Sequence, residues 1–374
     1  MVGICFPGES KLLLPSREGM LDMARIRGTR TARKWHCLAC VILFFIWHSP
    51  TASAELGRDW TQVTSGAAWG ARTYHKAVAY NGKMWVMGGH LGADDFADVW
   101  YSVDGKRWTV ARQMGLATLG SEYAAVVFNG KIWTLGANGG RDVYYSTDGG
   151  TWTRVVPAPP WLPRSGAAAV VHNGRIWVLG GCRWWTDPPV YYNDVWCSAD
   201  AVHWTSVTLG AQWPPLAGHQ ALSFDGKLWV IGGHYHFNGY DGESPMTWYS
   251  DDGRTWRLAA KGAPWGYRVG FGAAVAYRRI WLIGGVLVDS YGHIAQILSD
   301  VLSSTDGANW RYATTGAPWL PRLGHAVVVY GQRLWILGGM NYYFDGSGWH
   351  NTPLNDVWYS PIPTGAGPSW KSYP

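Results

Sequence analysis

The sequence predicts an all-β fold built from six similar units, and three observations support this prediction. First, an eleven-residue stretch that begins as DVWYSVDGKRW is repeated in similar form, at 98–108, 142–152, 194–204, 246–256 and 300–310, with its front half at 356–360. Second, a strand-like segment precedes each copy, and its tryptophan recurs at intervals of 44 to 54 residues. Third, Gly (49) and Trp (27) are abundant and only 15% of residues are charged, which disfavours both a helical and a disordered chain.

The length of the repeat predicts a particular β architecture. A period of roughly 40–50 residues made of short β segments is typical of a β-propeller. In the first unit we expect four strands, labelled a to d, in the segments HKAVAY, KMWVMG, DVWYS and RWTVA. Asn-Gly or Asp-Gly between a and b suits a tight hairpin, and a long variable loop joins b to c. We therefore predict a six-bladed β-propeller of four-stranded antiparallel blades, in which the repeated stretch is the c–d hairpin of each blade.

Most of the tryptophans fall at repeated positions in strands b, c and d or in the d–a connection. A large ring fills the wedge between two flat sheets, so we expect these residues to pack between blades. Trp184, Trp185 and Trp349 lie in b–c loops, where the repeat requires no tryptophan.

The two ends of the repeat array are complementary. The last unit has strands a to c but lacks the rest of the c–d turn, whereas RDWTQV at 58–63 has the strand-d pattern without a blade of its own. We expect this N-terminal strand, with Trp60, to complete the last blade, because closure removes two sheet edges. The competitor is PSWKSY at 368–373, whose tryptophan lies twelve residues past Trp358 where the other units use eight.

The first 54 residues differ in kind from the rest. A basic segment (ARIRGTRTARK), an apolar run (CLACVILFFIW) and a small-residue exit at 52–54 form the pattern of a secretory signal peptide. The apolar run is shorter than the roughly 20 residues that a membrane span needs, so we expect no stable membrane anchor after cleavage. The predicted organisation is a leader at 1–54 and a single propeller domain at 55–374, in a secreted or periplasmic protein.

Charge and cysteine content narrow the function further. The leader holds 7 of the 31 basic and 3 of the 25 acidic residues, so the remaining chain is nearly neutral and a nucleic-acid partner is not favoured. Its two cysteines, Cys182 and Cys197, are predicted to sit about four positions out of register on strands b and c. That offset exceeds disulfide reach, so we predict free thiols. We also expect a monomer.

Several of these motifs together resemble the kelch repeat. The likeness rests on a Gly-Gly doublet after strand b (Gly136-Ala137 in the second unit), a following aromatic residue, a later Trp and an Arg-x-x-His that opens the next unit, over about 58–360. The c–d turns, S-x-D-G-x-x-W, also resemble the Asp-box of sialidase-type propellers, although they are one residue shorter and Ala201 replaces one glycine. In both families these residues stabilise turns, so the resemblance gives them no site role. Kelch-like propellers include protein-binding modules, a galactose oxidase-like copper radical enzyme and a secreted sialic-acid epimerase.

The b–c loops are long, differ from blade to blade and are rich in aromatic residues, as binding loops on a rigid frame tend to be. Aromatic faces beside hydrogen-bonding groups suit sugars, whereas the alternative is that these rings only pack the loops. The candidate ligand-binding residues are Trp184, Trp185, His234, His236, Tyr240, Tyr342, Tyr343, Trp349 and His350.

A second candidate set points toward the axis. Arg72, Arg164 and Arg322 hold equivalent positions at the start of strand a, and Arg268 is placed one position off. Three arginines near a pore could hold a carboxylate through forked hydrogen bonds. The stronger alternative is that Arg-x-x-His belongs to the repeat and ties loops together. The predicted axial cluster is Arg72, His75, Glu122, Arg164, His219, Arg322 and His325.

These observations lead to two functional hypotheses. The first is recognition of a carbohydrate or protein ligand through the b–c loop face without catalysis. The second is a carbohydrate-active enzyme, an epimerase or a sialidase-like enzyme, that acts on an acidic sugar at the axis. The His234-x-His236 pair has no diagnostic metal-ligand spacing, and a copper radical site needs a Cys close to a Tyr. We predict no metal and no cofactor.

Overall fold

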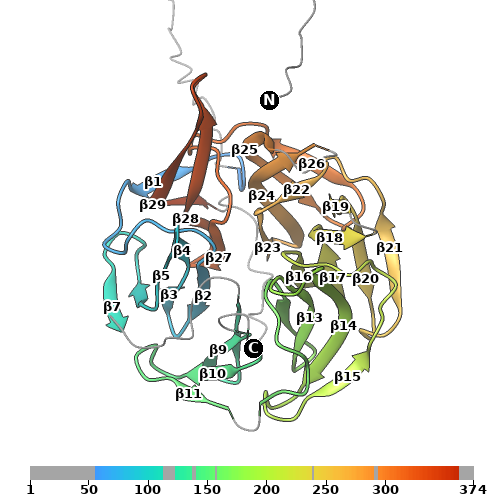
Figure 1. The fold of residues 1–374 in the computed structure, drawn as a ribbon. Helices are drawn as coiled ribbons and strands as arrows, with labels where there is room; N and C mark the ends of the chain where they lie inside the picture. Colours follow the sequence, from blue (N-terminus) through green and yellow to red (C-terminus); the bar gives the residue numbers. More distant parts are fainter. Residues whose placement is uncertain are drawn as a thin grey trace, which may run out of the picture. The chain divides into compact units, whose positions relative to one another are not determined.

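The computed structural model of the chain describes residues 55–112, 123–136, 140–155, 158–237, 240–289 and 294–361. These residues contain no helix, and therefore none that could span a membrane. Their strands form six four-stranded antiparallel sheets that stand as blades around a central axis (Figure 1). The inner strands of neighbouring blades contact one another in a closed cycle, from the first blade to the sixth and back to the first. The predicted six-bladed, all-β propeller is confirmed, whereas the predicted leader at 1–54 lies outside the described residues.

The first three blades follow the predicted order from the inner strand a to the outer strand d. Blade 1 contains β2 (Lys76–Tyr80), β3 (Lys83–Met87), β6 (Val99–Ser102) and β7 (Thr109–Arg112), with a small loop hairpin of β4 (His90–Leu91) and β5 (Asp94–Asp95). Blade 2 contains β8 (Ala124–Phe128), β9 (Lys131–Leu135), β10 (Val143–Ser146) and β11 (Thr153–Arg154). Blade 3 contains β12 (Ala168–His172), β13 (Arg175–Arg183), β14 (Val190–Ser198) and β15 (Thr205–Thr208).

The other three blades follow the same order of strands. Blade 4 contains β16 (Gln220–Phe224), β17 (Lys227–Ile231), β20 (Thr247–Ser250) and β21 (Trp256–Ala260), with a loop hairpin of β18 (His234–Phe237) and β19 (Tyr240–Glu243). Blade 5 contains β23 (Gly272–Ala276), β24 (Arg279–Val288), β25 (Ile294–Ser304) and β26 (Trp310–Thr314), and β22 (Arg268–Val269) also pairs with β24. Blade 6 contains β27 (Ala326–Tyr330), β28 (Arg333–Phe344), β29 (Trp349–Pro361) and β1 (Thr61–Thr64).

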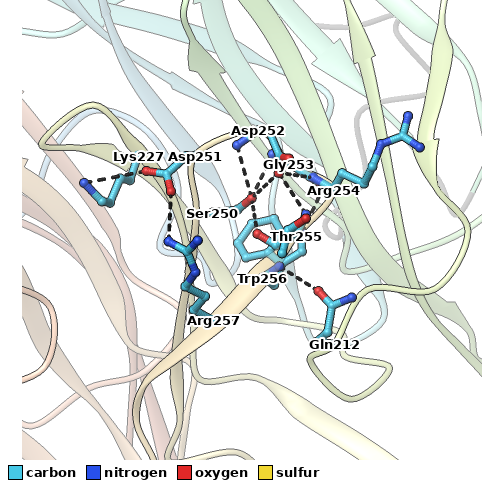
Figure 2. Close-up of polar contacts among 10 residues, drawn as sticks. All are labelled: Gln212, Lys227, Ser250, Asp251, Asp252, Gly253, Arg254, Thr255, Trp256 and Arg257. Carbon is cyan, nitrogen blue, oxygen red and sulfur yellow. Dashed lines mark hydrogen bonds and ion pairs between the residues drawn. The ribbon is translucent and has the colours of Figure 1, made fainter.

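The c–d turns are held by their own Ser and Asp side chains, as predicted. In blade 4 the Ser250 hydroxyl accepts a hydrogen bond from the Gly253 amide, and the Asp252 carboxylate accepts from the amides of Arg254 and Thr255, all at 2.8 Å (Figure 2). The Trp256 indole closes the turn by donating to the Gly253 carbonyl at 3.0 Å. Amide donors stabilise the charged carboxylate, and they lower the pKa of Asp252. The side chains of this motif are therefore used within the turn.

A strand-b tryptophan lies against the c–d turn of the following blade at each junction. A Cβ atom added to Gly105 would come within 2.3 Å of the Trp335 ring, and one added to Gly149 within 2.0 Å of the Trp85 ring. The third turn has Ala201 at the glycine position, buried in the same cluster as Trp133. All six strand-b tryptophans are buried, which confirms their predicted packing role.

The sixth turn is assembled from the two ends of the repeat array. β1 pairs antiparallel with β29. The Gly57 amide donates to the Ser360 hydroxyl at 2.7 Å, as the corresponding glycine and serine do within a single segment in the other turns. The Trp60 indole donates to the Gly57 carbonyl at 3.0 Å, and a Cβ atom on Gly57 would come within 2.2 Å of the Trp281 ring in blade 5. The N-terminal segment thus supplies the half of the turn that the C-terminal segment lacks.

The carbonyl of Glu55 takes the place of the missing turn aspartate, because the amides of Arg58 and Asp59 donate to it at 3.1 and 3.0 Å. The competitor segment at 368–373 lies outside the described residues.

Cys182 and Cys197 are buried free thiols, as predicted. The register differs in detail from the prediction. Cys182 faces Tyr191, six positions from Cys197 rather than the expected four or so, and a bulge between Leu179 and Gly181 accounts for one position of this difference. Cys197 faces Trp177, five residues before Cys182 on the same strand.

Deletion of residues 55–64 should destabilise the propeller strongly. The deletion removes β1, exposes the edge of β29 and uncovers the Trp281 ring, so we expect the free energy of unfolding to fall by several kcal/mol, roughly the cost of losing a buried aromatic contact and a paired strand. Urea unfolding of the truncated and full-length proteins measures the difference. Deletion of residues 368–374 is the matched control and should be tolerated. The reverse result, with the C-terminal deletion costing more, would mean that the other end closes the ring.

Candidate functional site

Two b–c hairpins carry most of the predicted ligand-binding residues. On the blade 3 hairpin, Trp184 lies flat on the His234 ring of blade 4, with 4.7 Å between centroids and an interplanar angle of 18°. Tyr191 meets Trp184 and His234 edge-on, at 5.4 and 5.6 Å. Trp185, next to this stack, is 56% exposed. The contacts among Trp184, Tyr191 and His234 hold this part of the hairpin in place, while the Trp185 ring remains open to solvent.

The blade 6 hairpin repeats this arrangement with different residues. It extends beyond the ring of blades (Figure 1). Tyr343 stacks on His350 at 5.4 Å and 25°, and Asp345 holds the His350 ring through a 2.8 Å contact. Phe344 is 58% exposed beside them. Exposed apolar side chains at adjacent positions mark a surface that can bind a partner or ligand.

The structure divides the predicted ligand-binding set into two groups. Blades 3 and 6 are three positions apart in a ring of six, so Trp184 and Trp185 lie on the opposite side of the axis from Tyr342, Tyr343 and His350. His236, Tyr240 and Trp349 lie in β18, β19 and β29, but their side chains are outside the part of the chain that the structure describes.

A cavity of about 360 Å³ opens where blade 6 meets blade 1. Its wall on blade 1 includes Thr73, Tyr74 and His90, and its wall on blade 6 includes Tyr342 and Asn351. The volume lies within the range of small-molecule sites. Of these residues the sequence prediction named only Tyr342. We call this feature the seam cavity.

The predicted axial arginines are paired inside their own blades. Arg164 forms a fork with Asp194 at 2.5 and 2.9 Å, and Arg322 forms one with Asp356 at 2.6 and 2.8 Å. Arg72 pairs in the same way with Asp98. Each guanidinium also donates to the first glycine carbonyl of its doublet, and all three side chains are almost fully buried. These contacts fit the alternative in which the arginine ties loops together, and they leave no open guanidinium at these positions for a ligand carboxylate.

The position of Arg268 in the repeat differs from the sequence prediction. It forms the equivalent fork with Asp300, at 2.6 and 2.8 Å, so it occupies the same position as the other three arginines rather than one place off. Blade 4 has Leu216 and Met246 where these blades have the arginine and its aspartate. Because both fork residues are replaced together in blade 4, the sequence already indicated that the arginine and the aspartate are paired.

The three predicted axial histidines are buried between blades. Burial lowers the pKa of His219 and of His325 to about 3, and lowers the pKa of His75 well below its usual value. The charges of Arg322 and Arg72 lower the pKa of His325 and His75 further. Tyr123 of blade 2 holds the matching position and donates to the Met87 carbonyl of blade 1 at 2.8 Å, and Glu122 lies outside the described residues. These side chains pack the blade junctions.

Comparison with known proteins identifies the repeat. The KLHDC2/KLHL20/DRC7 Kelch-repeats domain matches residues 138–339, which is more than half of the chain. The chain belongs to the kelch-repeat family. The Kelch motif itself matches residues 321–359, in blade 6, and the DUF6242 beta propeller domain matches residues 59–163.

Individual relatives of this kelch protein are distant. A leucine-zipper-like transcriptional regulator 1 homolog of Drosophila melanogaster is 25% identical over 179 residues, which cover 43% of this chain but only 17% of that relative. The solved structure titled "Structure of YjhT" is similar in fold, with a TM-score of 0.60 at 13% identity, and the match covers 78% of this chain and 99% of that one. At this identity the likeness concerns the fold.

Acid should destabilise the kelch propeller through its buried histidines. An unfolded histidine has a pKa of about 6.5, whereas His219 and His325 have pKa values of about 3 in the fold. Below pH 6.5 the unfolded state therefore binds more protons, and stability falls as the pH drops from 6.5 toward 3. At pH 4.5 we expect a loss of roughly 2–3 kcal/mol for each histidine relative to pH 7.

Phe271 occupies the equivalent position in blade 5, so His325→Phe should remove one histidine's share of this loss. Urea unfolding at pH 7 and pH 4.5 measures it. Equal losses in the variant and the parent would contradict a buried neutral His325.

Proposed function

We propose that this kelch propeller is a non-catalytic binding protein that recognises carbohydrate through its b–c loop face. The observation that carries the proposal is that an exposed ring follows a stacked aromatic pair on each of two hairpins. Trp185 stands beside the Trp184–His234 stack, and Phe344 beside the Tyr343–His350 stack. Sugar rings stack their CH faces on aromatic surfaces that are already held in place, because such surfaces lose little conformational entropy on binding.

The buried arginine pairs weigh against the alternative of an enzyme that acts on an acidic sugar at the axis. Taking Arg72, Arg164 or Arg322 for a substrate carboxylate would leave a buried aspartate unpaired, and breaking a buried pair costs roughly 3–5 kcal/mol. The described residues that line the seam cavity include no carboxylate, and glycoside hydrolysis normally needs a pair of them. Binding is therefore the better fit to this face.

We also propose that the protein is exported and acts outside the cytoplasm. The basic, apolar and small-residue segments before Glu55 support this proposal. Gly57 and β1 complete the sixth blade, so cleavage after residue 54 would keep these contacts. Amino-terminal sequencing of protein from the culture medium or periplasm tests the cleavage site.

Oligosaccharide binding should depend on the exposed rings at the hairpin tips. We expect the wild-type protein to bind a subset of a glycan array, and the double variant Trp185→Ala with Phe344→Ala to bind these glycans about fivefold more weakly, since each stack contributes on the order of 1 kcal/mol. Both rings are more than half exposed, so the melting temperature should stay within a few degrees. Val103→Ala is the matched control, because Val103 is 62% exposed in a c–d turn on the opposite face. An array on which the wild-type protein binds no glycan would contradict the proposed function.

A further inference from the structure

Tyr74 departs from the repeat at a position where the backbone requires unusual geometry. Its φ is +54°, a left-handed conformation that bulky residues rarely adopt. Blades 3 to 6 have glycine at the equivalent position, with φ between 62° and 66°, at Gly166, Gly218, Gly270 and Gly324. Blade 1 therefore carries a large aromatic side chain in a conformation that favours glycine, and such local strain is found preferentially at functional sites.

The strained residue is held firmly in place. The Tyr74 amide donates to the Gly324 carbonyl of blade 6 at 2.7 Å, and the same contact links Gly218 to Gly166 and Gly324 to Gly270 at 2.8 Å. The backbone of Tyr74 thus belongs to a set of hydrogen bonds that join neighbouring blades. The fold fixes its backbone conformation, and with it the direction in which the side chain leaves the chain.

The place where the ring is presented is the seam cavity. Tyr74 lies 5.6 Å from the His90 ring and lines the cavity with it. At the junction of blades 3 and 4 the equivalents of Tyr342 and His90 are Trp184 and His234, which stack directly on each other. At the junction of blades 6 and 1 the corresponding pair instead borders a space of about 360 Å³. The two junctions have aromatic residues at equivalent positions. The rings stack on each other at the junction of blades 3 and 4, whereas they border a cavity at the junction of blades 6 and 1.

The chemistry of the cavity wall defines the class of ligand. It offers the rings of Tyr74, Tyr342 and His90 and the exposed amide of Asn351. No Lys, Arg, Asp or Glu lies among the described lining residues. The wall suits a small uncharged molecule with a flat apolar face and several hydroxyl groups.

We propose that the seam cavity binds one uncharged sugar ring, with Tyr74 as its stacking platform and Asn351 as a hydrogen-bonding contact. This inference rests on the proposed function and adds the place and the charge class of the ligand. Longer glycans would continue from the cavity along the exposed blade 6 hairpin, since Tyr342 in the wall is followed directly by Tyr343 and Phe344.

Saturation-transfer NMR with small probes tests the proposal. The probes are glucose, galactose, mannose and N-acetylglucosamine, with sialic acid as an acidic comparator. We expect transfer to at least one neutral sugar and none to sialic acid. Tyr74→Gly restores the residue that four other blades use, so it should leave the melting temperature unchanged or raise it while weakening sugar binding at least tenfold. Asn351→Ala should also weaken binding, by about fivefold.

The controls separate this inference from the proposed function. Val103→Ala should bind the monosaccharide as the wild type does, because Val103 is 62% exposed in a c–d turn on the opposite face. Unchanged monosaccharide binding by Tyr74→Gly would overturn the seam cavity as the site, and so would the absence of any monosaccharide binding by the wild type, even if array glycans still bound. A large drop in the melting temperature of Tyr74→Gly would mean that the ring serves the fold.

Discussion

The contact between a strand-b tryptophan and the glycine of the next c–d turn is the interaction on which the propeller depends. Neighbouring blades are flat sheets that splay apart with distance from the axis, and a buried indole fills part of that wedge. The ring reaches the neighbouring backbone because the turn residue there has at most a Cβ atom. The serine and aspartate of the turn then fix the backbone that the ring touches. The eleven-residue repeat forms the c–d turn that the tryptophan of the preceding blade contacts, so each blade needs its own copy.

This packing constraint explains which parts of the six repeats differ from one another. The a–b and c–d hairpins recur in the blades, and the buried Arg–Asp forks recur in blades 1, 3, 5 and 6, because they hold the blades and their junctions. The b–c hairpins lie beyond these junctions, so their lengths range from the two-residue strands of blade 1 to the long strands β28 and β29 of blade 6. A rigid frame with one variable face is the arrangement expected of a binding protein. The seam cavity and the exposed aromatic tips both lie on that face.

Much of the fold could be predicted from the sequence because the repeat is regular. The period, the turn residues and the tryptophan positions define strands, blades and packing without reference to long-range contacts. The Arg–Asp forks were missed because their partners lie 26 to 34 residues apart across loops of different length. Arg268 was misplaced because the a–b turn of blade 5 is Tyr277-Arg278 rather than Asn-Gly, so that Tyr277 within the turn aligns falsely with Tyr80, which precedes the turn of blade 1.

The candidate site was less predictable, for a physical reason. The aromatic character of the b–c loops was visible in the sequence, but whether two rings stack or stand apart around a cavity depends on how neighbouring blades meet. Tyr74 did carry a signal, since it replaces a glycine that four other blades share. That signal was readable in the sequence, because the alignment of Arg72, Arg164 and Arg322 places Tyr74 opposite Gly166 and Gly324.

Valine substitution at three glycines tests most directly whether the two ends of the chain form a blade junction like the others. Gly57, Gly105 and Gly82 all have positive φ, but only Gly57 and Gly105 face a tryptophan ring, whereas Gly82 has nothing within 4 Å. Gly82→Val should therefore cost only the left-handed backbone strain, on the order of 1–2 kcal/mol. Gly57→Val and Gly105→Val should each cost at least twice as much in the free energy of unfolding, and by similar amounts. A Gly57→Val protein as stable as Gly82→Val, with Gly105→Val strongly destabilised, would contradict the closure of the ring by the N-terminal segment.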